Sequence, residues 1–186
     1  WLAGHAKSLG LKSRVHRTGG HPIVTAATPR RRNSAKPHFL VYGHYDVQPP
    51  EPLELWDSPP FEPTLRGSNL FARGASDNKG QHFAHLKGVE AYLKTGTELP
   101  CDLTFVVEGE EEVGGEALVG FLKQNKSELK CDGVVVSDTG MPDLKHPALT
   151  YALRGVAALE VKLTGPDRDL HSGIYGGSVE NPAMAL

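Results

Sequence analysis

Three short apolar runs recur along the chain, at residues 39–42, 103–107 and 133–136. Each is nearly continuous and consists largely of β-branched or aromatic residues, a pattern typical of strands that are buried on both faces. Two further extended segments, 13–17 and 22–27, predict a hairpin at the edge of the same sheet. The hydrophobic pattern therefore predicts a sheet whose central strands are enclosed.

Helical periodicity fills the intervals between the three runs. In the first interval, apolar residues recur at three- and four-residue spacing: Phe83, Leu86, Val89 and Leu93. Gly96 follows them as a C-terminal stop, and residues 117–126 form a second amphipathic stretch. Because strands and helices alternate, we predict an α/β domain with a mostly parallel central sheet.

The pattern changes after residue 150. Residues 156–163 alternate between apolar and polar side chains, which predicts a half-solvated antiparallel strand. We therefore place a domain boundary here, with a first domain at 1–150 and the beginning of a second at 151–186.

Three other segments lack such patterns or are cut short. Residues 48–66 contain six prolines, which predicts a loop that is either functional or disordered. Residues 1–9 are typical of the end of a helix and residues 181–186 of the beginning of one. We therefore expect the sequence to be a piece of a longer protein.

Composition narrows the possible partners. The formal net charge is −2, and the one cationic run, at 30–32, lies among loop-forming residues, so no nucleic-acid partner is expected. No apolar stretch approaches the ~20 residues that cross a bilayer, so no membrane partner is expected either. Two cysteines, Cys101 and Cys131, are too few for a disulfide framework or a zinc–thiolate site. These features favour a cytoplasmic protein.

Polar side chains follow each of the three buried strands. His44 and Asp46 follow the first, the acidic run 108–112 follows the second, and Asp138 follows the third. Because the carboxyl ends of parallel strands meet at one edge of a sheet, these side chains should lie close together. Asp77, just before the first long helix, should join them.

Each of these residues also has a purely structural explanation. His44 could be a turn residue, Asp77 could cap its helix, and the acidic run 108–112 could be a solvated helix start. Taken together they are harder to explain, because clustered carboxylates repel one another unless a cation or protons neutralise them. Nitrogen and oxygen ligands without thiolate suit Zn²⁺, Mn²⁺ or Co²⁺, and the excess of acids suggests two ions ~3.5–4 Å apart. Asp46 could then hold the His44 imidazole.

The segments that carry these residues resemble the ordered sequence blocks of the carnosinase/aminoacylase family of metallopeptidases, nearest to cytosolic nonspecific dipeptidases and carnosinases. The blocks are GHYDVQP at 43–49, GASDNKG at 74–80, EGEEEVG at 108–114, Ser137-Asp138 and DLHSGIYGG at 169–177. The resemblance implies a three-layer sandwich with a mostly parallel sheet, the phosphorylase/hydrolase-like core of zinc peptidases. Residues 1–150 would be the N-terminal part of this catalytic domain, and 151–186 the beginning of an inserted α+β lid and dimerisation domain.

The resemblance also implies a set of metal ligands. Asp77 would bridge two divalent ions, most simply zinc, with manganese or cobalt as alternatives. His44 and Asp138 would complete one site, and Glu112 would ligate the other ion. The family's second site also needs a histidine from a later part of the catalytic domain. His146 is the nearest candidate after Asp138, but it matches no motif.

The remaining roles follow from the same resemblance. Glu111 would be the general base, taking a proton from a metal-bridging water, and Asp46 would support the first-site histidine. His171 would stabilise the oxyanion, reaching into the partner's active site in a homodimer. The implied activity is hydrolysis of dipeptides or similar small peptides. Hydrolysis of N-acyl amino acids on the same core is the first alternative, and an inactive metal-binding fragment is the second.

A serine acyl hydrolase is a competing hypothesis. Residues 76–79 match both S-x-x-K and S-D-N, and residues 94–96 match K-T-G. The first two motifs share Ser76, whereas the mechanism needs them on separate elements. The K-T-G motif also closes a predicted helix instead of lying on a strand, so we favour the metal site.

Overall fold

The structure is a computed structural model that describes residues 1–29 and 34–186. The arginine run at 30–32 therefore lies outside the described residues. The chain divides into two compact units, residues 1–140 and residues 141–186, which are described separately below.

A five-stranded sheet forms the centre of the first unit, in the order β1-β2-β6-β3-β7. The strands are β1 (Lys12–His16), β2 (Ile23–Ala27), β3 (His38–His44), β6 (Asp102–Glu108) and β7 (Gly133–Val136). β3 runs parallel to β6 and β7, whereas β1 and β2 form an antiparallel hairpin that joins the edge of β6. The predicted strands and the edge hairpin are confirmed.

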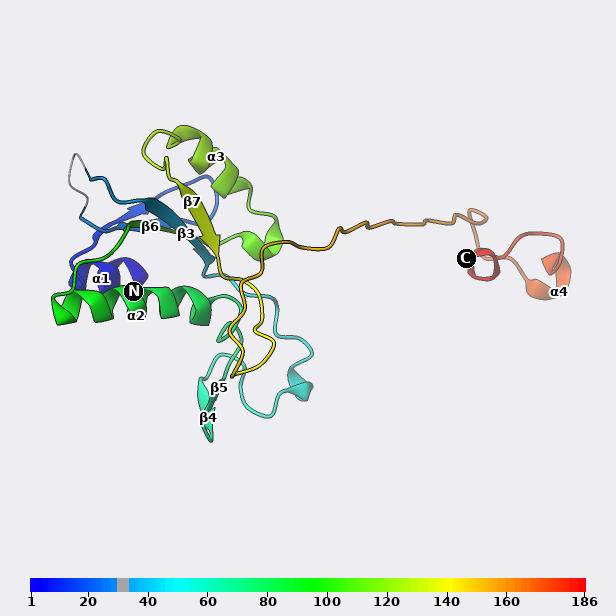
Figure 1. The fold of residues 1–186 in the computed structure, drawn as a ribbon. Coiled ribbons are helices and arrows are strands. Elements are labelled where there is room, and N and C mark those ends of the chain that lie inside the picture. Colours follow the sequence, from blue (N-terminus) through cyan, green and yellow to red (C-terminus); the bar gives the residue numbers. More distant parts are fainter. Residues whose placement is uncertain (30–33) are drawn as a thin grey trace. The chain divides into compact units, whose positions relative to one another are not determined.

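Helices cover both faces of this sheet (Figure 1). α1 (Leu2–Ser8) and α2 (Lys79–Thr95) pack on one face, and α3 (Glu116–Gln124) packs on the other. Successive residues of a strand point to opposite faces. Val41 and Phe105 therefore join the core under α1 and α2, whereas Leu40 and Val106 join the core under α3. The three-layer α/β architecture is confirmed.

β7, one of the two outer strands of the sheet, is less buried than expected. β7 was expected to be enclosed on both faces, but Val134 and Val136 are 60% and 58% exposed. The physical reason is its position, because β7 pairs only with β3 among the described residues. A short apolar run alone does not distinguish an edge strand from a central one.

Glycines in the left-handed conformation follow two of the predicted helices. Gly96 adopts a left-handed conformation (φ 70°) after α2, and Gly10 does the same (φ 84°) shortly after α1. Such a conformation is costly for residues with a side chain, so these glycines terminate the helices. None of the helices in the described part of the chain has the length and apolar character needed to span a membrane.

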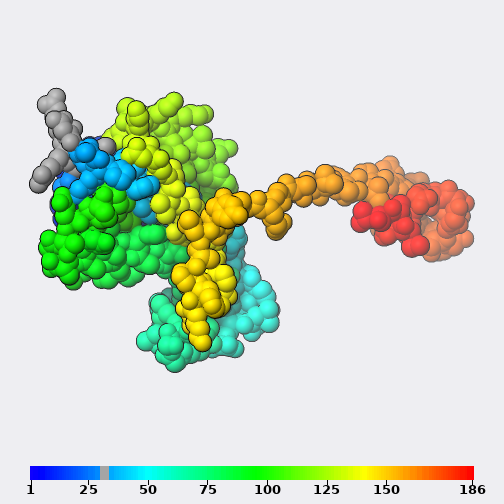
Figure 2. All heavy atoms as spheres, in the orientation of Figure 1, coloured from blue at the N-terminus to red at the C-terminus, as the bar shows by residue number. Residues whose placement is uncertain are grey.

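The proline-rich segment is ordered. It contains a short 3₁₀ helix, η1 (Leu53–Leu55), and ends in β4 (Thr64–Arg66), which pairs with β5 (Asn69–Phe71) just beyond the segment. Trp56 Nε1 donates to the Pro50 carbonyl oxygen at 2.7 Å, and the Arg73 guanidinium lies 5.1 Å from the Trp56 ring. In Figure 2 this segment, coloured cyan to teal, forms a lobe of the first unit.

The second unit contains two short helices, α4 (Ser172–Tyr175) and α5 (Pro182–Ala185). The predicted strand at 156–163 is wrong, because no strand forms in the described residues of this unit. All residues from 151 to 163 are exposed, and in Figure 2 this stretch (orange) runs as a single extended segment. An alternating pattern becomes a strand only where a neighbouring strand completes its hydrogen bonds.

Candidate metal centre

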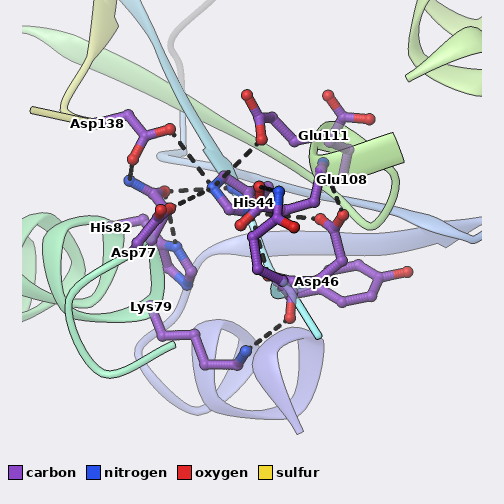
Figure 3. Close-up of polar contacts among 12 residues, drawn as sticks. His44, Asp46, Asp77, Lys79, His82, Glu108, Glu111 and Asp138 are labelled. Carbon is purple, nitrogen blue, oxygen red and sulfur yellow. Dashed lines mark hydrogen bonds and ion pairs between the residues drawn. The ribbon is translucent and has the colours of Figure 1, made fainter. Parts of the chain in front are cut away.

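The three parallel strands end at one edge of the sheet. His44 is the last residue of β3 and pairs in register with Glu108, the last residue of β6, and Asp138 follows the end of β7. This arrangement brings side chains from distant parts of the sequence together (Figure 3). The convergence expected from the strand ends is therefore found.

His44 lies at the centre of this cluster, and its side chain is completely buried. Its Nε2 lies 3.0 Å from Asp77 Oδ1, 3.4 Å from Asp138 Oδ2 and 3.9 Å from Glu111 Oε2. Among the described residues, two sets of three offer ligand atoms within 4.8 Å of one another: His44 with Asp77 and Asp138, and His44 with Glu111 and Glu112.

Asp46 lies behind the imidazole. Its backbone carbonyl oxygen is 3.1 Å from His44 Nδ1, and its Oδ1 is 3.3 Å from the same nitrogen. A carbonyl oxygen can only accept, so Nδ1 carries a hydrogen and Nε2 directs its lone pair towards the carboxylates when the ring is neutral. Asp46 Oδ2 also accepts the Glu112 backbone N–H at 3.0 Å, which ties the two candidate ligand sets together.

Asp77 does not cap its helix. α2 begins at Lys79, and the N-cap position belongs to Asn78. The Asp77 side chain is 64% exposed and directs Oδ1 to His44 Nε2. The structural explanation that the sequence left open for Asp77 therefore fails.

The electrostatics show that the cluster needs positive charge. Burial, the largest single influence, lowers the pKa of His44, but the carboxylates of Asp138, Glu111 and Asp46 together with the Asp46 backbone outweigh it, and the net shift is upward. Burial raises the pKa of Glu111, and the neighbouring carboxylates of Glu112 and Asp138 add to the rise. Both shifts favour the protonated forms of His44 and Glu111, which reduces the negative charge of the cluster.

A divalent cation fits the same residues. When the imidazole is neutral, His44 Nε2 and Asp77 Oδ1 direct lone pairs at each other across 3.0 Å and repel each other. A metal ion that accepts both lone pairs removes this repulsion. The donors are imidazole nitrogen and carboxylate oxygen, as in zinc, manganese and cobalt sites without thiolate. The residues of this edge could therefore hold a divalent metal.

Several residues around the cluster have no counterpart among the expected site residues. Glu108 is 3% exposed and accepts a hydrogen bond from the Tyr42 hydroxyl at 2.7 Å, and its pKa is raised, chiefly by burial. Gln48 Nε2 donates to Glu112 Oε2 at 2.6 Å, and Lys79 Nζ donates to the Tyr45 carbonyl oxygen at 2.7 Å. Glu108 belongs to the acidic run 108–112 that the sequence places at this edge, and its register with His44 agrees with that placement, but no role is predicted for it.

The serine hydrolase hypothesis does not fit this geometry. Ser76 lies just before the N-terminus of α2, whereas Lys94 and Thr95 lie in its last turn and Gly96 caps it. At 1.5 Å per residue, this 17-residue helix separates the motifs by roughly 25 Å. A serine and the K-T-G motif at that separation cannot act on the same bond.

Two histidines considered from the sequence belong to the second unit. His171 caps α4: its Nδ1 accepts the Gly173 N–H at 3.0 Å, which leaves the ring hydrogen of the neutral form on Nε2. His146 Nδ1 lies 2.7 Å from Asp143 Oδ2, and both side chains are exposed. Neither histidine belongs to the two candidate ligand sets found among the described residues.

Comparison with known proteins identifies relatives that cover most of the chain. The family model described as peptidase family M20/M25/M40 matches residues 40–174. The chain is 38% identical over 155 residues to Cys-Gly metallodipeptidase dug1 of Schizosaccharomyces pombe, covering 82% of this chain and 33% of the relative. It is 36% identical over 167 residues to the Beta-Ala-His dipeptidase of Rattus norvegicus, covering 89% and 34% respectively.

A solved structure shows the same similarity in three dimensions. The crystal structure of human carnosine dipeptidase 1 superposes with a TM-score of 0.73 at 27% identity, covering 98% of this chain and 40% of that chain. The present chain spans about a third of the length of the two curated relatives.

Proposed function

The chain belongs to peptidase family M20/M25/M40, and on this basis we propose that the protein hydrolyses the amide bond of dipeptides or similar small peptides with the help of two divalent metal ions. Relatives named for Cys-Gly and Beta-Ala-His dipeptides support the substrate class. The observation that carries the proposal is the convergence of His44 with four carboxylates from three other chain segments.

In this proposal the carboxylate of Asp77 would be shared between the two ions. His44, Asp77 and Asp138 would hold one ion, and Asp77 and Glu112 would hold the other. Both ions are most simply zinc. A bound divalent ion supplies Lewis acidity, which acidifies water and polarises a carbonyl oxygen. Asp46 holds the imidazole through Nδ1 and keeps Nε2 directed into the site.

Glu111 serves as the general base. Its carboxylate lies beside His44, 40% exposed, and can therefore be reached by a water molecule and a substrate. Its raised pKa brings the carboxylate closer to the pKa range at which a base works well near neutral pH. Glu111 takes a proton from the attacking water and passes it to the leaving amine.

The second unit supplies the oxyanion donor. The neutral ring of His171 carries its hydrogen on Nε2, so this nitrogen can donate to the oxygen of the tetrahedral intermediate. In this proposal residues 151–186 begin a lid and dimerisation domain, and His171 acts across a homodimer of a cytoplasmic protein. Residues 1–150 belong to the catalytic domain.

A substrate panel tests the proposal. Purified full-length protein should release amino acids from dipeptides, lose this activity in EDTA and regain it with Zn²⁺, Mn²⁺ or Co²⁺. A marked preference for N-acyl amino acids would instead support the aminoacylase-like alternative. Activity that survives EDTA but is lost in Ser76→Ala would overturn the metal-dependent mechanism.

The 186-residue chain by itself should be inactive or nearly so, because only Glu112 and the shared Asp77 are assigned to the second ion. Metal binding without turnover by this chain would agree with the proposal. Robust dipeptide hydrolysis by the chain alone would contradict the need for a further ligand.

A further inference from the structure

Asn78 connects all three members of one candidate ligand set. Its Nδ2 donates to the Ser137 carbonyl oxygen at 2.9 Å and to Asp138 Oδ1 at 3.0 Å. Its Oδ1 accepts the backbone N–H of His44 at 3.2 Å. Asn78 also follows Asp77 directly in the chain. One side chain and one peptide bond therefore join residues from the end of β3, the start of α2 and the end of β7.

The amide is not used to cap the helix. Asn78 occupies the N-cap position of α2, where an asparagine usually accepts an N–H from the first helical turn. Within the described part of the chain it makes no such capping bond, and only 1% of its surface is exposed. Both amide hydrogens are instead donated beyond the end of β7. The amide oxygen accepts the His44 N–H and also lies 3.4 Å from His82 Nδ1, and these contacts together fix the orientation of the group.

This geometry determines which carboxylate oxygen of Asp138 is available as a metal ligand. Asn78 holds Oδ1, whereas Oδ2 lies 3.4 Å from His44 Nε2, on the side of the candidate ligand set. Without the amide, the Asp138 carboxylate could rotate, and the backbone of His44 would lose its contact with α2. Because asparagine is neutral, it provides this support without adding charge to the carboxylate cluster.

We propose that Asn78 is a positioning residue of the metal centre: it holds Asp138 so that Oδ2 is the ligand atom, and it fixes the backbone that carries His44. This inference rests on the proposed metal-dependent function. Groups that orient metal ligands typically change metal affinity by 10–100-fold when they are removed. Asn78→Ala should therefore weaken metal binding by about 10–100-fold.

Cobalt titration of the full-length protein tests this role without relying on activity. Co²⁺ affinity and the visible absorption of bound Co²⁺ should both change in Asn78→Ala, because the coordination geometry at Asp138 is no longer fixed. Asn78→Ser, whose shorter side chain cannot span both strand ends, should behave similarly. Ser76→Ala is the matched control: it alters the exposed neighbour on the other side of Asp77 and should match the wild type.

The Co²⁺ titration distinguishes failure of the positioning role of Asn78 from failure of the metal-dependent function. Wild-type affinity and spectrum in folded Asn78 variants would overturn the positioning role while leaving the metal centre intact. Absence of Co²⁺ binding in the wild type would instead refute the metal-dependent function itself. Thermal unfolding of the metal-free proteins establishes folding, and failure of both Asn78 variants to fold would assign Asn78 to fold stability and contradict the proposal.

Discussion

The two units differ in strand pairing and in the burial of their side chains. In the first unit, the strands that end at the candidate metal centre pair with neighbours, and side chains such as Phe105 and Val106 are 2% and 1% exposed. In the second unit, residues 151–163 are all exposed, and Leu159 is 95% exposed. The side chains at the strand ends are positioned because the strands beneath them are buried. The candidate metal centre therefore rests on buried, paired strands, whereas residues 151–163 have no such support.

Glu111 provides the largest expected effect, because the chemical step is assigned to the first unit. Glu111→Gln removes the base but keeps the shape of the side chain, so kcat should fall by about 10²–10⁴-fold while metal content is unchanged. Steady-state kinetics combined with metal analysis measures both quantities. Glu116→Gln, the same change at an exposed residue at the start of α3, should have little effect. Loss of metal in Glu111→Gln would mean that the roles of Glu111 and Glu112 are exchanged.

Truncating one buried and one exposed leucine tests directly whether the two units differ in packing. Leu86 is 1% exposed in the core beneath α2, so Leu86→Ala should lower the free energy of unfolding by about 2–5 kcal/mol. Leu159→Ala, the same change at an exposed residue of the second unit, should change it by no more than about 0.5 kcal/mol. Urea unfolding followed by circular dichroism measures both values. A large loss in Leu159→Ala would show that residues 151–163 are packed in solution.

His171 tests whether the second unit contributes to catalysis. His171→Ala should lower kcat by about 10²–10³-fold, the usual effect of removing an oxyanion donor, with metal content unchanged. His146→Ala, which removes another exposed histidine of the same unit, serves as the control. Equal activity of the two variants would remove His171 from the mechanism and confine the chemistry to the first unit.

The smallest expected effect is a pH dependence of the first unit's stability. Burial, with smaller contributions from His44 and Lys79, lowers the pKa of His82 from 6.5 to about 4. The unfolded chain therefore binds a proton near pH 6.5 that the folded chain resists until about pH 4, so stability is lost as the pH falls through this window. Between pH 7 and 5 the loss should be about 2 kcal/mol. Urea unfolding of the metal-free protein should show this loss, and His82→Gln should reduce it. An unchanged loss in His82→Gln would assign the pH dependence to other groups.

The sequence predicted those features that depend on local pattern. The apolar runs of β3 and β6 predicted buried strands, and the order of strands and helices placed His44, Glu112 and Asp138 at one sheet edge. The exposed strand β7 and the absent strand at 156–163 were not predicted, because exposure depends on which neighbours a segment finds. Asn78 was missed for a similar reason: its partners lie 34 and 60 residues away, and only the direction of its side chain identifies them.

Whether His44 and the carboxylates around it form a metal centre can be measured directly. Calorimetric titration of the metal-free full-length protein with Zn²⁺, compared with Asp77→Ala, tests it most directly. The wild type should bind two ions per chain, and Asp77→Ala should lose high-affinity binding at both positions because Asp77 is assigned to bridge them. Absence of Zn²⁺, Mn²⁺ and Co²⁺ binding in the wild type, or identical binding by the two proteins, would contradict the assignment.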